Sequence, residues 1–459
     1  MRNDAAYTPH TAQERDEMLR VIGVDSIDAL FADIPERLRL QENLKLPSPM
    51  SEPELISHMN ALARENISGA THVCFMGGGA YDHFIPAAVG QLAGRQEFYT
   101  AYTPYQAEMS QGTLQSIFEY QSMICELTGM DLSNASMYDG ASACAEAMLM
   151  AHGVNDRTEI VIAGQVNPQY IEVCETYARF RGISVIRAPY DAKTGTASIE
   201  ALASLITDNC AGVIAQSPNF FGLLEDLGAI NQAAKAKGAL FINVADPVSL
   251  AILEPPSSFG ADIVVGEGQV LGNTMSFGGP GFGFFACKSD YMRKMPGRII
   301  GQTTDGQGRR GFILTLQARE QHIRREKATS NICSNQALCA LAAAMYMSLM
   351  GKEGLREVAT LCASKSRYMY NELIKTGKFA PVFSAPFFKE FALRYTGGDL
   401  GAFISGMTKA GFMPGIDLGG KYGLGADPAG AAKGCILIAV TEKRTKAEID
   451  AYVAKAGEI

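Results

Sequence analysis

The sequence predicts an α/β protein in which a large domain built on a mainly parallel sheet precedes a smaller α+β domain. Six short apolar runs lie between residues 160 and 286, and helix-like stretches of roughly ten to twenty residues separate most of them. Buried strands that alternate with helices imply a parallel sheet covered on both faces. Beyond residue 330, alternating and helical apolar patterns recur over a shorter length, which predicts the second domain at 331–459.

We expect residues 1–65 to form a helical arm ahead of the large domain. The large domain is expected at residues 66–330. Asp25 or Ser26 is positioned to cap a short helix that contains Leu30 and Phe31. Prolines then punctuate an extended link before the large domain begins. The opening residues contain no apolar core of a signal peptide, so we expect a cytoplasmic protein.

The large domain is expected to begin its regular structure with an amphipathic helix. Leu114, Ile117, Phe118 and Ile124 recur at helical spacing, and Gly129 closes that helix. The next apolar runs predict buried strands, because they are short and are bounded by polar segments. The expected strands are residues 160–164, 183–188, 212–216, 239–245, 262–266 and 282–286.

The smaller domain comes after a long apolar segment from Ala337 to Met350. This segment is too short to cross a bilayer, so a buried helix ending at Gly351 is expected and no membrane span. The later segments predict a half-exposed strand at 389–395, a helix with an apolar face at 400–407, a strand at 435–440, and a last helix behind a capping box of Thr445 and Glu448.

The composition excludes several classes of protein. Of the 459 residues, 47% are hydrophobic, which is enough for a large core, and the net charge of −8 does not favour nucleic acid. None of the ten cysteines forms a C-x-x-C pair, and none of the six histidines shows H-x-x-x-H spacing, so no metal site is expected. Unpaired cysteines in this number favour a reducing compartment.

Three segments fall where ligands bind in parallel sheets, at the carboxyl ends of strands. The GASACAE segment at 140–146 enters a helix, where backbone N–H groups and Ser142 can hold an anion, although an ordinary serine-capped helix is the commoner explanation of this motif alone. Asp246 ends an expected strand and can pair with a protonated ring nitrogen, or can simply form an Asp-Pro turn. Gly278 and Gly279 begin a glycine run that lets backbone approach a ligand.

Two other segments carry unusual polar groups. The segment YTPYQAEMSQG at 102–112 gathers rings and polar side chains immediately before a helix, which suits the wall of a binding site or a well-bonded turn. The segment MGGGAYDHFIP at 76–86 contains His83, and a lone histidine of this kind is more often structural than catalytic. The candidate wall residues are Tyr102, Thr103, Tyr105, Gln106 and Glu108, with His83 next.

These strings together resemble the P-protein of the glycine cleavage system along almost the whole chain. The most specific are YTPYQ-x-E-x-SQG and LTLQ-x-REQHIRR-x-KATSNIC, and the chain length matches the first of the two subunits into which that enzyme is divided in some organisms. The resemblance implies the type I pyridoxal-phosphate fold of the aspartate aminotransferase kind. It also implies pyridoxal-phosphate-dependent decarboxylation of glycine and transfer of the aminomethyl group to the lipoyl arm of the H-protein.

The same resemblance indicates that the cofactor-binding lysine is missing from this chain. In the subunit that holds the cofactor, the lysine precedes a G-G-P-G run, and the corresponding position here is Gln269. Asn167 also stands where members commonly carry a histidine. Ser142, Asp246, Gly278 and Gly279 are then expected to be remnants of a cofactor pocket, or parts of a shared one.

We therefore expect a heterodimer, or a dimer of heterodimers, with a homologous second subunit that holds pyridoxal phosphate covalently. The arginine-rich stretch at 298–327 is a candidate interface. Two alternatives stay open: a structural or regulatory subunit that contributes nothing to the active site, and a self-sufficient enzyme that uses another lysine such as Lys288 or Lys327.

Overall fold

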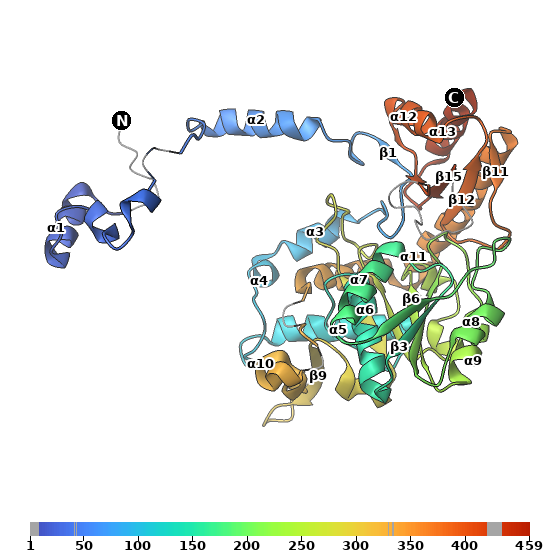
Figure 1. Cartoon of the computed structure of the whole chain (residues 1–459), viewed down its shortest axis with the longest axis horizontal. Coiled ribbons are helices and arrows are strands. Elements are labelled where there is room, and N and C mark those ends of the chain that lie inside the picture. Colours follow the sequence, from blue (N-terminus) through green and yellow to red (C-terminus); the bar gives the residue numbers. More distant parts are fainter. Residues whose placement is uncertain (1–8, 41, 43, 329, 333–334, 420–433) are drawn as a thin grey trace. The chain divides into compact units, whose positions relative to one another are not determined.

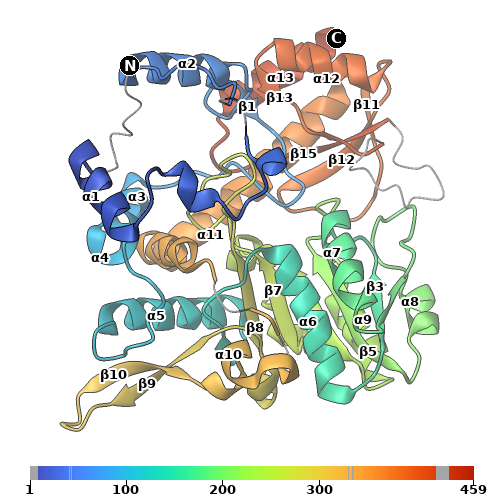
Figure 2. The ribbon, with the colours of Figure 1, turned by 60° about the vertical axis from the view of Figure 1, so that its left-hand side comes forward.

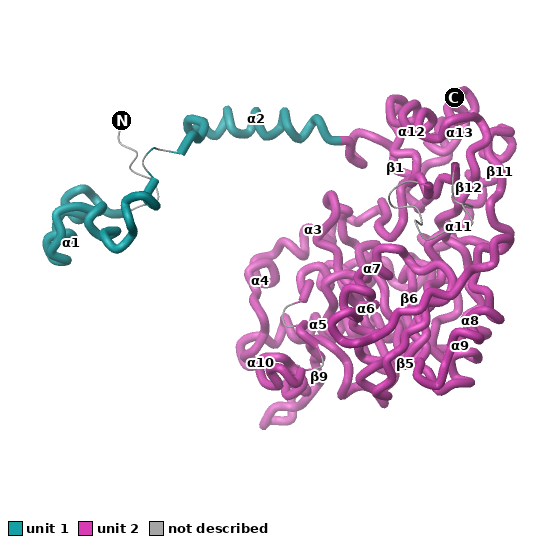
Figure 3. The backbone as a smooth tube through the Cα atoms, in the orientation of Figure 1, with its two compact units in different colours: residues 1–66 teal, residues 67–459 magenta. Residues whose placement is uncertain are grey.

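The computed structural model describes residues 9–40, 42, 44–328, 330–332, 335–419 and 434–459. The chain divides into two compact units, residues 1–66 and residues 67–459 (Figure 3). The described part of the first unit contains the helices α1 (Ala12–Ile22) and α2 (Glu52–Arg64) and the short 3-10 turns Asp28–Phe31 and Glu36–Leu38, and none of these elements has a buried residue. The predicted short helix is a 3-10 turn whose N-cap residue is Ile27, and the hydroxyl of Ser26, one residue earlier, accepts the N–H of Ala29 at 3.2 Å.

The second unit is built on a seven-stranded sheet with the order β2-β8-β7-β6-β5-β3-β4 (Figure 1). The five strands from β7 to β4 are parallel, whereas β8 and β2 run antiparallel to their neighbours. All six predicted strands are confirmed as β3 to β8, and the sheet contains a seventh strand, β2, that was not predicted. The strands are β2 (Leu132–Ser133), β3 (Glu159–Ala163), β4 (Ser184–Arg187), β5 (Cys210–Ser217), β6 (Leu240–Ala245), β7 (Ile263–Glu267) and β8 (Gly283–Cys287).

Helices cover both faces of this sheet (Figure 2). Along β6, Ile242 and Val244 face a core shared with α6 and α7, whereas Phe241 and Ala245 face a core shared with α5, α9 and α11. Burial on both faces explains why the strands are continuous apolar runs. The helices are α3 (Ala87–Ala93), α4 (Gln96–Tyr99), α5 (Gln111–Thr128), α6 (Gly140–Asn155), α7 (Pro168–Arg179), α8 (Ile199–Leu205), α9 (Leu227–Lys235) and α11 (Ala337–Lys375).

Two glycines act on helix ends as the sequence predicts. Gly129 adopts a left-handed conformation (φ 70°) and donates its N–H to the carbonyl of Cys125, which ends α5. Gly351 (φ 59°, ψ −175°) interrupts α11, but a second helical stretch continues directly to Lys375. The predicted end of the helix at Gly351 is therefore confirmed as a break in the helix. The second helical stretch beyond it was not predicted.

The smaller sheet has the order β11-β12-β15-β14 and is covered by α12 (Leu400–Lys409) and α13 (Lys446–Glu458). The strand predicted at 389–395 is present as β12, but the prediction that it is half-exposed is wrong. The strand lies between β11 and β15 and is buried along most of its length. Its first residue, Glu390, is buried and bonded to Gly78 and Tyr81. The strands are β11 (Phe379–Pro381), β12 (Glu390–Tyr395), β14 (Ile416–Asp417) and β15 (Cys435–Ala439).

The remaining elements connect or extend the two sheets. The strand pair β1 (Val73–Cys74) and β13 (Phe412–Met413) is parallel, and β9 (Ile299–Thr304) forms an antiparallel hairpin with β10 (Arg310–Thr315). Short helical turns come next at α10 (Gln321–Arg324) and Arg325–Lys327. Within the described residues, no helix is long and apolar enough to cross a membrane.

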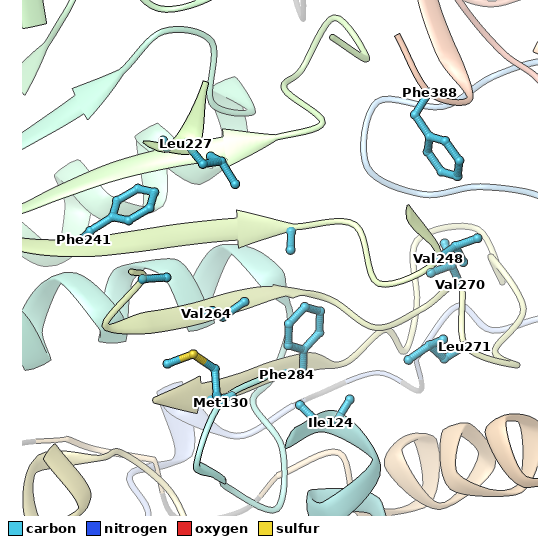
Figure 4. Packing of buried hydrophobic residues seen from close by; sticks show 14 of the residues in the cluster. Ile124, Met130, Leu227, Phe241, Val248, Val264, Val270, Leu271, Phe284 and Phe388 are labelled. Carbon is cyan, nitrogen blue, oxygen red and sulfur yellow. The ribbon is translucent and has the colours of Figure 1, made fainter. Parts of the chain in front are cut away.

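One end of the large core lies directly under the candidate site. Figure 4 shows Val248, Val270 and Phe388 beyond the carboxyl ends of the parallel strands. Each of these residues lies within two positions of a polar residue of the site, namely Asp246, Gln269 or Lys389. The packed core therefore sets the positions of those side chains.

Candidate functional site

The centre of the candidate site is a buried ion pair at the carboxyl end of β6. The Nζ atom of Lys389 lies 2.6 Å from the Oδ2 atom of Asp246, and the lysine side chain is only 2% exposed. The same ammonium lies 3.8 Å from the centre of the Tyr81 ring, which adds a cation–π contact. The sequence left two roles open for Asp246, pairing with a ring nitrogen or forming an Asp-Pro turn. In the structure its carboxylate accepts the N–H of Val248 at 3.0 Å, as in such a turn, and pairs with a lysine of the same chain.

Glu390, the residue after this lysine, binds the glycine-rich segment that precedes Tyr81. Its carboxylate accepts the N–H of Gly78 at 2.7 Å and the phenol hydroxyl of Tyr81 at 2.9 Å. Burial raises the pKa of Glu390 to about 7, although these two hydrogen bonds and the neighbouring ammonium of Lys389 oppose the shift. Lys389 and Glu390, at the start of β12, thus bring two charges into the interior, and Glu390 fixes the segment 77–81 over the strand ends.

His83 lies in the same network and is fully enclosed. Its Nε2 atom is 3.1 Å from the Nζ atom of Lys389, and its Nδ1 atom is 2.6 Å from Glu442. Because an ammonium only donates, Nε2 must accept, and the neutral ring then donates from Nδ1 to the carboxylate. Burial and the charge of Lys389 lower the pKa of His83, which agrees with a neutral ring.

The Glu442 carboxylate holds this histidine in place. Burial alone raises the pKa of Glu442, but the hydrogen bonds from His83 and from the N–H of Phe84 outweigh it and lower the pKa to about 2. Among the described residues, His83, Cys362 and Glu442 bring ligand atoms within 4.8 Å of one another. Lys389 already contacts the histidine, and burial raises the pKa of the Cys362 thiol, so this cluster is a hydrogen-bond network without metal-binding character.

A second carboxylate lies at the start of α6, the anion position predicted from GASACAE. The Oε2 atom of Glu267 accepts the N–H of Gly140 at 2.9 Å, and Oε1 accepts the N–H groups of Gln269 (3.0 Å) and Phe282 (3.1 Å). Ser142 does not reach this anion position. Its hydroxyl completes a capping box in which Asp139 is the N-cap and Ser142 the N3 residue, so the helix is capped as the alternative interpretation expected, but by an aspartate instead of a serine.

Gln269, at the position expected for the cofactor lysine, is 5% exposed and all of its amide atoms have partners. Its Oε1 atom accepts the N–H of Tyr81 at 3.0 Å, while Nε2 donates to the carbonyls of Tyr81 (3.2 Å) and Asn273 (2.7 Å). Asn167 caps α7 and donates to the carbonyl of Gly78 at 3.0 Å. Both residues therefore hold the glycine-rich segment and have no free group for a ligand.

Two cavities adjoin these residues. A small one of about 40 Å³ lies between Asp246, Glu267, Lys389 and Glu390. A much larger one of about 2040 Å³ is bordered by the glycine-rich segment, by Gln269 and by the second glycine run with Gly278 (φ 114°) and Gly279 (φ 141°). Neither Asp246 nor Lys389 borders the larger cavity.

The predicted wall loop lies elsewhere. None of Tyr102, Thr103, Tyr105, Gln106 and Glu108 borders either cavity. Tyr102 is 83% exposed and Tyr105 is 50% exposed, whereas His83 lies inside the buried network. Tyr105 accepts a hydrogen bond from Arg298 at 3.0 Å, and Arg298 lies in turn near Glu320 (3.8 Å). The structure therefore does not bring the loop and the pocket together within one chain.

Sequence reasoning missed Lys389, Glu267 and Glu390. Lys389 and Glu390 were interpreted only as polar positions of a strand, and Glu267 only as part of the glycine-rich segment. One signal was available: a Lys-Glu pair immediately before apolar strand residues is unusual for a buried strand, since such charges are buried only with partners.

Comparison with solved structures defines the class of fold. The chain superposes on a Lactobacillus brevis glutamate decarboxylase (TM-score 0.69, 12% identity, 94% of this chain and 96% of that chain). It also superposes on a C-DES mutant with glycine covalently linked to its PLP cofactor (TM-score 0.61, 16% identity, 86% and 99%). These likenesses concern the fold alone and confirm the predicted type I pyridoxal-phosphate fold.

The chain belongs to the glycine cleavage system P-protein family, whose model matches residues 5–455. It is 51% identical over 453 residues to the probable glycine dehydrogenase (decarboxylating) subunit 1 of Desulforamulus reducens, covering 99% of both chains, and 52% identical over 447 residues to that of Chlorobium limicola (97% and 98%). A crystal structure of glycine decarboxylase (P-protein) of the glycine cleavage system, in inhibitor-bound form, superposes with a TM-score of 0.88 at 42% identity (98% and 99%).

Proposed function

We propose that this chain is the first subunit of a two-subunit glycine dehydrogenase (decarboxylating), active only with a homologous second subunit that holds pyridoxal phosphate covalently. The pair decarboxylates glycine and passes the aminomethyl group to the lipoyl arm of the H-protein. The family and the relatives of the same length support the reaction. The observation that carries the placement of the cofactor is Gln269, an amide that cannot form an imine, at the position expected for the lysine.

The residues of this chain do not fit pyridoxal phosphate in their own pocket. Asp246, the group suited to a protonated pyridine nitrogen, is paired with Lys389 at 2.6 Å. The Gln269 side chain is bonded to Tyr81 and Asn273. The cavity between Asp246 and Glu267 measures about 40 Å³, whereas ligand pockets usually measure roughly 300–1,000 Å³. We therefore assign no step of the reaction to a cofactor on this chain.

The contribution of this chain is placed in the loop 102–108. Rings and polar side chains exposed on a loop are free to meet a second chain, and type I enzymes build their active sites between subunits. Arg298 holds Tyr105 through a hydrogen bond and lies 5.3 Å from the centre of its ring, so the loop is oriented before a partner binds. In this proposal Tyr105 and Gln106 position substrate at the cofactor of the second subunit.

The structure weakens the self-sufficient alternative. Lys288 comes directly after β8, which runs antiparallel to β7, so it lies at the opposite edge of the sheet from Asp246. Its Nζ atom is paired with Asp262 at 2.8 Å. Lys327 is exposed in a short turn. The purely structural alternative differs from our proposal only in the role of the loop.

Reconstitution with the second subunit tests the role of the loop. We expect Tyr105→Phe and Gln106→Ala to lower glycine–CO2 exchange in the mixture by about tenfold or more, with subunit association unchanged, because positioning groups act on the bound substrate. Tyr99→Phe is the matched control, since Tyr99 is 67% exposed on α4 but outside the loop. Exchange rates equal to wild type in both loop variants would favour the structural alternative.

A further inference from the structure

We infer that the cofactor pocket of this chain is filled by its own side chains, with the Glu267 carboxylate in the place of a phosphate and the Lys389 ammonium in the place of a pyridinium nitrogen. The inference deepens the proposed function, on which it rests, because it says why this chain carries no cofactor beyond the loss of one lysine. It predicts that restoring the lysine alone does not restore binding.

The anion position is the start of α6, a 16-residue helix whose first N–H groups point away from the helix body. The carboxylate of Glu267 accepts the N–H of Gly140 and also those of Gln269 and Phe282, so three backbone donors converge on one anion. One of these donors, Gly140, lies at the helix start, where free N–H groups hold phosphate in nucleotide and cofactor sites, and the other two, Gln269 and Phe282, come from the glycine-rich segment that follows β7. A phosphate cannot enter without displacing this carboxylate.

The neighbourhood of Gly140 leaves little room for an additional group. A single methyl carbon added at Gly140 would overlap the hydroxyl of Tyr170 and would lie 2.8 Å from the backbone nitrogen of Glu267. A carbon added at Gly281 would meet the Glu267 carboxylate at 2.9 Å. The chain is therefore packed tightly around the carboxylate, as around a bound ligand.

The group that would bind the cation of a cofactor, a pyridinium nitrogen, is the carboxylate of Asp246 at the carboxyl end of β6. The ammonium of Lys389 lies 2.6 Å from its carboxylate and is also bound by His83 and by the face of the Tyr81 ring. A carboxylate, a ring nitrogen and an aromatic face together stabilise this ammonium in the interior, because each contact compensates for its removal from water. A pyridinium would have to compete with this internal cation for the same carboxylate.

The two positions belong to one pocket. Asp246, Lys389 and Glu267 all border the cavity of about 40 Å³, which has room for a few water molecules. Glu267 also borders the larger cavity, and so does Gln269, whose amide is bonded to Tyr81 and Asn273. Anion, cation and lysine positions of a cofactor site are thus each occupied by a side chain.

The first test measures pyridoxal phosphate retained by the full-length chain, as the mass of the borohydride-reduced adduct and its position in peptides. We expect no adduct at residue 269 in Gln269→Lys, and an adduct there when Glu267→Ala and Lys389→Ala are added. An adduct in Gln269→Lys alone would overturn the inference and leave the proposed function intact. An adduct on the wild-type chain would instead contradict the proposed placement of the cofactor.

The second test uses inorganic phosphate and does not need the triple variant to fold. We expect phosphate, compared with chloride at equal ionic strength, to raise the Tm of Glu267→Ala and not that of wild type, because the freed N–H groups bind the anion. Glu225→Ala is the matched control, because burial raises the pKa of both carboxyls to about 7 but Glu225 caps no helix. Equal responses in Glu267→Ala and Glu225→Ala would overturn the inference.

Discussion

The pocket at the strand ends and the loop at 102–108 satisfy their polar groups in opposite ways. In the pocket, Asp246, Glu267 and Gln269 are bonded to atoms of the same chain. In the loop, Tyr102 and Gln106 are exposed to solvent. The comparison indicates that a pocket inherited with a fold can be closed from within, while a loop elsewhere on the chain stays exposed and available to a second chain.

Removing the internal cation is expected to have the largest effect on the closed pocket. Lys389→Met leaves Asp246 enclosed without its partner, and loss of one member of a buried ion pair costs about 3–5 kcal/mol. Denaturant unfolding measures this loss. Lys375→Met, which removes an exposed pair with Glu372, is the control and is expected to cost about 0–1 kcal/mol. A loss in Lys389→Met no larger than in the control would show that the pocket is open to water.

The pH dependence of stability sharpens the same contrast. Burial raises the pKa of Glu390 from 4.5 to about 7, so the folded chain holds this proton more tightly than the unfolded chain. Its contribution is therefore full below pH 4.5 and is lost as the pH rises to about 7. The free energy of unfolding of the wild type should therefore fall by up to about 3 kcal/mol across this pH window, at about 1.4 kcal/mol per pKa unit, and Glu390→Gln should remove this fall. Parallel stability curves for wild type and variant across that window would contradict the assignment.

Gln269→Leu tests the amide at the lysine position. Leucine fills the space but leaves the N–H of Tyr81 and the carbonyl of Asn273 without their partner, which costs about 1–3 kcal/mol. Gln115→Leu is the comparison, because Gln115 lies on α5 and bonds only the exposed Glu119. Similar Tm values for the two variants would mean that Gln269 does not hold the glycine-rich segment.

Substitutions in the loop are expected to have the smallest effect on the chain alone. Tyr102→Ala and Gln106→Ala remove exposed groups and should change the free energy of unfolding by about 0.5 kcal/mol or less. Thermal unfolding of the isolated chain measures this, and the reconstituted pair then reports on function. Destabilisation comparable to that of Gln269→Leu would show that the loop is part of the packed core. The difference between the buried pocket and the exposed loop would then not hold.

The sequence predicted the frame of the molecule better than its site. Strands buried on both faces leave continuous apolar runs, and glycines such as Gly129 and Gly351 mark helix breaks, so local patterns were sufficient. The pairing of Lys389 with Asp246 joins residues that flank strands of two different sheets, β12 and β6, and no local pattern encodes that contact. The exposure of the strand at 389–395 was predicted wrongly for the same reason, since alternation of apolar and polar residues normally indicates one solvent-exposed face.

The most direct measurement of the central claim is the borohydride-reduced pyridoxal adduct in the reconstituted pair, with glycine–CO2 exchange assayed for each subunit alone and for the mixture. We expect an adduct only on the second subunit and exchange only in the mixture. An adduct on this chain together with exchange by this chain alone would contradict the claim, because the pocket around Asp246 and Gln269 would then bind the cofactor.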